Sequence, residues 1–139
     1  MIETEPSRGP MRAEQLRDFL HECVASGPAE QPARLAEAAQ LLNGGVDRSK
    51  FAAMIACGAY ESAAMLLLGP DLSFLLSRGA NGVCIASAVL ADEDEDVTAQ
   101  AATPALALIA AHVAAVLAGD GRAGVPLRRS PDLAGARPH

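Results

Sequence analysis

The sequence predicts an α+β fold, in which N-terminal helices precede a helix, a three-stranded antiparallel sheet and a C-terminal helix packed on that sheet. Three observations indicate it. Apolar residues recur at helical spacing before residue 70, residues 72–90 have the pattern of a β-hairpin, and residues 103–118 form one long apolar segment. With 139 residues, the chain has the length of one domain.

The expected domain spans residues 10–118. Residues 1–9 are polar and carry no apolar periodicity, so we expect a disordered N-terminus. Residues 119–139 are rich in Gly, Pro and Arg, again without a period, and we expect a disordered tail.

Four helices are expected before the sheet. The first two cover residues 10–24 and about 30–42, where apolar residues three and four apart form a stripe, and each is followed by helix-breaking Gly or Pro. Asp47 is expected to cap a third helix that runs to about Cys57. The fourth covers about 60–68 and ends at a Gly-Pro pair that leads into the first strand.

The hairpin consists of two apolar runs, 72–77 and 83–90, around a turn. Asn81-Gly82 is typical of a two-residue type I′ turn, in which both central residues need a positive φ. A four-residue loop over 79–82 is the alternative. Both loops contain an even number of residues, so both predict the same grouping of side chains on the two faces.

One predicted face of the hairpin is bulky and the other is small. The bulky face holds Leu72, Phe74, Leu76, Val83, Ile85 and Val89, with Ser87 as its polar member. We expect it to pack on the long helix, so that Ile85→Asp unfolds the domain. The small face is still too apolar to lie open to water, and we infer that the N-terminal helices or another subunit cover it. Its candidate partner or subunit contacts are Ser73, Leu75, Ser77, Cys84, Ala86 and Ala88; Leu90 completes the face.

The rest of the domain is a third strand and the long helix. Residues 92–96 are consecutive acids, which favour a solvated turn over a calcium loop, because a calcium loop spaces its ligands and includes a glycine. Residues 97–101 alternate as a short strand does. Thr103 and Pro104 then suit the start of a helix that ends near Ala118. This helix is apolar nearly all round, so we expect it to be buried on more than one side and not to span a membrane.

Composition and charge exclude several classes of protein. The net charge is −6, so nucleic-acid binding is not expected. No membrane partner is expected either, because the long apolar helix is too short and too rich in alanine to span a bilayer. Cys23, Cys57 and Cys84 lack the paired spacing of a zinc site and are expected to be buried free thiols. No secretory leader is apparent, and a reducing cytoplasm fits these thiols.

The residues do not assemble a catalytic centre. His112 lies on the apolar helix, and local spacing places no nucleophile or carboxylate near it, so we interpret it as a core or edge histidine. Gly79 and Gly82 lack the Lys-Ser/Thr sequence of a phosphate loop. We therefore expect no enzyme, no cofactor and no metal site.

The alternative function is DNA binding. Residues 35–56 have the outline of a helix-turn-helix, and Arg48, Ser49 and Lys50 would stand where a recognition helix reads bases. The turn contains two glycines, and few other basic residues lie nearby to hold phosphates. A helical hairpin with a structural role is the preferred interpretation.

The segment 59–118 resembles the phage ABA sandwich proteins of phages and prophages. The residues that carry this resemblance are Tyr60-Glu61-Ser62-Ala63-Ala64, then Leu66-Leu67-Leu68 with Gly69-Pro70, and finally Ala102-Thr103-Pro104-Ala105-Leu106-Ala107-Leu108. The resemblance implies a helix, a sheet and a closing helix, and no established activity. We therefore expect a small non-enzymatic accessory protein that acts through protein–protein contacts, with a protein partner or as a homo-oligomer.

Overall fold

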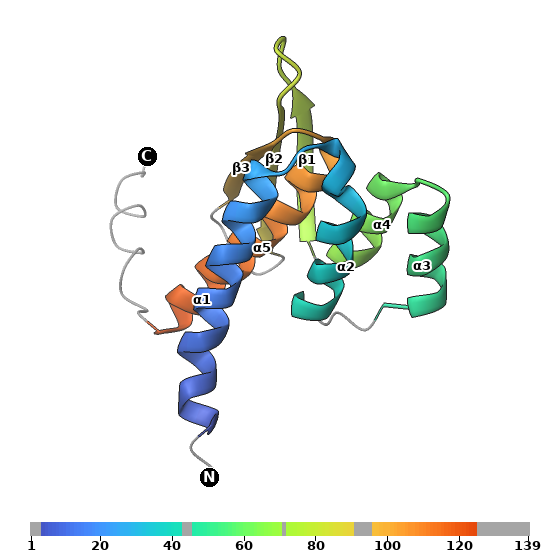
Figure 1. Cartoon of the computed structure of the whole chain (residues 1–139). Helices are drawn as coiled ribbons and strands as arrows, with labels where there is room; N and C mark the ends of the chain where they lie inside the picture. Colours follow the sequence, from blue (N-terminus) through green and yellow to red (C-terminus); the bar gives the residue numbers. More distant parts are fainter. Residues whose placement is uncertain (1–3, 43–45, 71, 91–95, 125–139) are drawn as a thin grey trace.

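Helix α5 (Pro104–Gly124) lies between a three-stranded sheet and a layer of helices in the computed structural model, which describes residues 4–42, 46–70, 72–90 and 96–124 (Figure 1). The strands are β1 (Leu72–Arg78), β2 (Cys84–Leu90) and β3 (Val97–Ala101), antiparallel in the order β1-β2-β3. The other helices in these ranges are α1 (Thr4–Ala25), η1 (Pro28–Glu30, a 3₁₀ turn), α2 (Gln31–Leu42), α3 (Arg48–Ala56) and α4 (Tyr60–Leu68). The predicted α+β class, with the C-terminal helix on the sheet, is confirmed.

Two predicted helix starts are confirmed by their capping bonds. The backbone N–H of Lys50 donates to Oδ1 of Asp47 over 3.1 Å, which stabilises the first turn of α3. The backbone N–H of Leu106 donates to Oγ1 of Thr103 over 3.2 Å at the start of α5, and Pro104 occupies the first helical position. These side chains satisfy donors that no helical carbonyl can reach.

The first and last helices are longer than the sequence predicts. Helix α1 begins at Thr4 rather than at Pro10, and α5 continues past Gly119 to Gly124. Glycine lowers helix stability by about 1 kcal/mol relative to alanine but does not force a helix to end. The predicted disordered segments 1–9 and 119–139 therefore overlap helices; residues 1–3 and 125–139 lie outside the described residues.

Helix α5 supplies the centre of the core. Leu106, Ile109 and Val113 are fully buried, and the alanines between them are buried too. Strands β2 and β3 pack on one side of α5, while α1, α4 and α2 pack on its other sides. The expectation that this helix is buried on more than one side is confirmed. Among the described helices, none combines the length and hydropathy that a membrane crossing requires.

The hairpin loop differs from both predicted loops. The N–H of Gly79 donates to the carbonyl of Val83 over 2.8 Å, and the N–H of Gly82 donates to the carbonyl of Gly79 over 3.0 Å. Between this pair lie Ala80, Asn81 and Gly82, and Gly82 has a φ of 90°. This is a three-residue loop, in which a turn is followed by a left-handed glycine.

An odd loop length moves the pairing by one residue and exchanges the faces of β2. Leu76 pairs with Ala86 and Phe74 with Ala88, so Cys84, Ala86 and Ala88 share the α5 side with Leu72, Phe74 and Leu76. The predicted bulky face is therefore wrong. Ile85 and Val89 lie half-buried on the opposite face, with Ser73, Leu75, Ser77 and Ser87.

Candidate functional site

Strand β1 is an edge strand whose hydrophobic side chains are largely uncovered. Only Leu72 in this strand is buried; Phe74 and Leu76 are each 39% exposed and Leu75 is 72% exposed. Phe74 and Leu76 point to the α5 side, but α5 lies over β2 and β3 and reaches β1 little. Three consecutive large apolar residues thus contact solvent at one edge of the sheet.

The backbone of β1 also has an unpaired edge. Since Gly79 and Val83 form a hydrogen-bonded pair, the alternation of an antiparallel ladder turns the N–H and C=O groups of Ser73, Leu75 and Ser77 toward β2. The backbone N–H and C=O groups of the alternate residues point away from β2, toward solvent. These residues are Leu72, Phe74, Leu76 and Arg78. Among the residues that the structure describes, no strand pairs with this side.

Natural edge strands usually carry features that prevent further pairing, such as charges, proline or bulges along their length. The interior of β1, Ser73 to Ser77, has no charged residue and no proline. Its loop end projects beyond the layer of helices (Figure 1). The edge is therefore accessible and chemically suited to pairing with another strand.

The face of the sheet opposite α5 is open and holds a shallow cavity of about 310 Å³. Ser73, Leu75 and Val89 contribute to its lining, and Asp96 is the one ionisable residue in the described part of that lining. Nearby, the hydroxyls of Ser87 and Thr98 are 3.1 Å apart and bond to each other.

The six candidate contact residues from the hairpin do not form one surface. Ser73, Leu75 and Ser77 are exposed on the open face. Cys84, Ala86 and Ala88 are at most 2% exposed and lie on the α5 side of the sheet. The inferred cover of this face, by the N-terminal helices or another subunit, is wrong for Cys84, Ala86 and Ala88, because α5 covers them.

The three candidate DNA-contact residues lie together at the start of α3. Arg48, Ser49 and Lys50 are all exposed, beside the capping Asp47. However, α3 packs against α4 rather than against α2, so α2 and α3 do not form the packed helix pair on which a helix-turn-helix depends. DNA contact by these residues stays a prediction.

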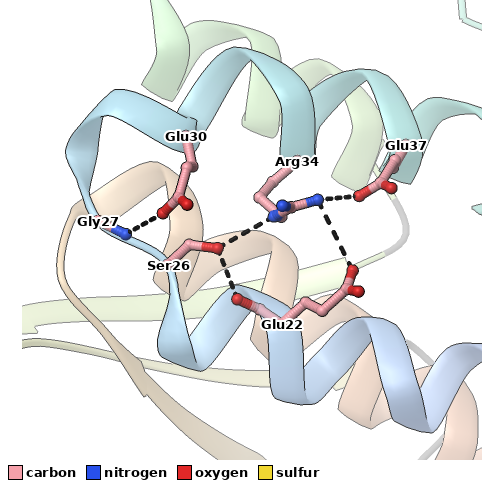
Figure 2. A network of polar contacts seen from close by, with 6 residues as sticks. All are labelled: Glu22, Ser26, Gly27, Glu30, Arg34 and Glu37. Carbon is pink, nitrogen blue, oxygen red and sulfur yellow. Dashed lines mark hydrogen bonds and ion pairs between the residues drawn. The ribbon is translucent and has the colours of Figure 1, made fainter.

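A polar network joins α1 to α2 at the corner between them (Figure 2). Nε of Arg34 donates to Oγ of Ser26 over 3.0 Å, and its Nη1 pairs with Glu37 and, at 3.6 Å, with Glu22. Oγ of Ser26 in turn donates to the Glu22 carbonyl over 2.6 Å. Because the charges of this network are directed at one another, we interpret it as a structural clamp. No group of three metal-ligating residues occurs in the described part of the chain.

The three cysteines are free, as predicted, but only two are buried. Burial raises the pKa of Cys23 to about 12, although the nearby Arg34 charge acts in the opposite direction. Cys84 is buried under α5, whereas Cys57 is exposed at the residue that ends α3. The prediction of a buried Cys57 is therefore wrong, because the chain turns into solvent there.

His112 is half-buried on α5, and its Nδ1 has no hydrogen-bond partner among the described residues. Burial lowers the pKa of this imidazole from its ordinary value of 6.5, because the charged form loses hydration. The half-buried ring fits the core or edge histidine that the sequence predicts, and no described residue bonds to Nδ1 to orient the ring as a base.

This histidine predicts a pH dependence of stability. Above pH 6.5 the imidazole is neutral in both the folded and the unfolded chain, so its contribution to stability is complete. As pH falls below 6.5, the unfolded chain takes up the proton first, and stability decreases until the lowered folded-state pKa is passed. Urea unfolding at pH about 7.5 and about 5.5 should show a larger loss for the wild type than for His112→Gln. Equal losses in the two proteins would contradict the prediction.

Comparison with known proteins identifies no relative: no family model, no curated protein and no solved structure matches the chain. The exposed side chains and unpaired backbone groups of β1 are therefore the basis for a proposed function.

Proposed function

We propose that the protein is a non-enzymatic accessory protein of phage or prophage type that acts through protein–protein contact, and that strand β1 makes this contact. One observation carries the proposal: Phe74, Leu75 and Leu76 are exposed in succession along an unpaired sheet edge.

Strand addition is the mode of contact that this edge favours. A partner strand would bond to the outward N–H and C=O groups of β1, and these backbone bonds supply affinity. Phe74 and Leu76 would pack on one face of the extended sheet and Leu75 on the other. Removing these side chains from water contributes roughly 25 cal/mol for each Å² of apolar surface buried.

The phage-type part of the proposal is supported by the order of elements. From Tyr60 onward the chain runs α4, β1, β2, β3 and α5, which is the order that the resemblance to the phage ABA sandwich proteins implies. The accessory role is supported by the cavity on the open face, where Asp96 is the one ionisable residue among the lining residues that the structure describes.

A photoreactive residue placed in β1 tests the proposal. Leu75 is replaced by p-benzoylphenylalanine in cells that express the protein, and Gln100, exposed on the same face of β3, is replaced in a matched control. Irradiation should give discrete protein adducts from position 75 and few from position 100. If position 75 gives no more adducts than position 100, β1 is not a contact strand and the proposal fails.

A further inference from the structure

We infer that the strand which pairs with β1 is β1 of a second copy, in antiparallel orientation about a two-fold axis through Leu75. This inference rests on the proposed contact through β1 and names its partner. It follows from the residue pattern of the strand, the direction of its free backbone groups and the arrangement of its charge.

The residue pattern of β1 between Ser73 and Ser77 is symmetric about Leu75. Ser73 and Ser77 lie two residues to either side, and Phe74 and Leu76, both large and apolar, lie one residue to either side. Antiparallel pairing centred on Leu75 therefore sets Ser73 opposite Ser77, Phe74 opposite Leu76, and Leu75 opposite itself. An isologous two-fold interface requires this kind of self-complementarity.

The backbone meets the same condition. The outward groups belong to Leu72, Phe74, Leu76 and Arg78, as the bond between Gly79 and Val83 indicates. Pairing about Leu75 matches Phe74 with Leu76 and Leu72 with Arg78, so each outward residue meets another outward residue. Other antiparallel registers that also match outward residues with outward residues are shifted along the strand and leave one end unpaired. The register centred on Leu75 pairs β1 along its whole length.

The side chains and the charge agree with this register. Both copies keep α5 on the same side of the joined sheet, so Phe74 and Leu76 of the two copies form one apolar group beside the helices. Arg78 is the one charged residue of β1, and the register places the two Arg78 side chains at opposite ends of the paired strands. No like charges oppose each other across the joint.

Disulfide trapping tests the register directly. Leu75 and its counterpart would form a non-hydrogen-bonded pair, with Cα atoms about 4.5 Å apart, a distance that a disulfide can bridge. The variants are made on a Cys57→Ser background, since Cys57 is exposed. Under mild oxidation Leu75→Cys should become a disulfide-linked dimer, whereas Ser77→Cys alone should not. A mixture of Ser73→Cys and Ser77→Cys chains should again cross-link.

A charge pair at the same position provides a second test. Leu75→Lys and Leu75→Asp should each be monomeric in sedimentation equilibrium, because like charges would face each other at the two-fold axis, while their mixture should restore the dimer. Gln100→Lys is the control and should dimerise as the wild type does. Circular dichroism checks that each variant remains folded, which the exposure of Leu75 leads us to expect.

The outcomes separate this inference from the proposed function. A monomeric wild type whose photoadducts at position 75 contain other proteins would overturn self-pairing and leave the contact through β1 intact. A monomer without such adducts would overturn both. A dimer in which Ser77→Cys cross-links as readily as Leu75→Cys would contradict the register.

Discussion

Ala86→Asp is expected to unfold the protein, whereas Ile85→Asp is expected to leave it folded. Ala86 is completely buried between β2 and α5, so an aspartate there would place a carboxylate among apolar side chains without a partner. Ile85 is half-buried on the open face, where a carboxylate remains in water. A burial of this kind costs several kcal/mol, which is comparable to the total stability of about 5–15 kcal/mol of a typical domain.

Thermal melts of the two variants, followed by circular dichroism, measure the difference. The two residues are adjacent in β2, and isoleucine has the higher strand propensity, so the loss of propensity is larger at position 85 and acts against the expected order of stabilities. A cooperative melt of Ala86→Asp together with an unfolded Ile85→Asp would show that the hairpin has the even loop and not the three-residue loop.

Leu106→Ala is expected to lower the free energy of unfolding by about 2–5 kcal/mol, the range observed when a buried leucine is truncated in a packed core. Leu106 is fully buried in α5, and α5 packs against the sheet and several helices. Leu75→Ala removes the same atoms from an exposed site and should change stability by no more than about 0.5 kcal/mol.

Urea titrations of the wild type, Leu106→Ala and Leu75→Ala provide the test. The m-values of the three proteins should agree, because each chain exposes nearly the same surface when it unfolds. A loss at Leu106 that is no greater than the loss at Leu75 would mean that α5 is not the centre of the core.

The elements of this fold were largely predictable because their signals are local. Helix α4 and strand β3 begin and end at the predicted residues, since glycine, proline and alternating residues mark their boundaries. The caps at Asp47 and Thr103 were predicted for the same reason: a capping bond spans only three residues.

The faces of the hairpin were not predictable from the same signals. Asn81-Gly82 favours a two-residue turn, but Gly82 instead closes a three-residue loop, and the difference of one residue exchanges the faces of β2. The size of the side chains was a better indication than the turn sequence of which face of β2 packs on α5. Helix α5 buries many alanines and can approach a sheet closely, so it packs on Cys84, Ala86 and Ala88 rather than on Ile85 and Val89.

The candidate site depends on information that no local pattern contains. Phe74 and Leu76 have the sequence character of core residues, and they are exposed because β1 is at the edge of the sheet and α5 is placed over the other two strands. Strand order and the lateral position of a helix are tertiary properties. The one sequence signal was the run Phe74-Leu75-Leu76, because an alternating strand cannot bury three consecutive residues on one face.

The position of α5 in the chain has a consequence for synthesis. Each other layer of the core packs on α5, yet α5 is translated after all of them. While the ribosome is still adding residues 104–124, the finished helices and the hairpin lack the surface that covers Ala86, Ala88 and Leu16. The nascent chain therefore acquires its complete tertiary structure only after α5 has left the ribosome, and before that point it presents apolar surface to chaperones.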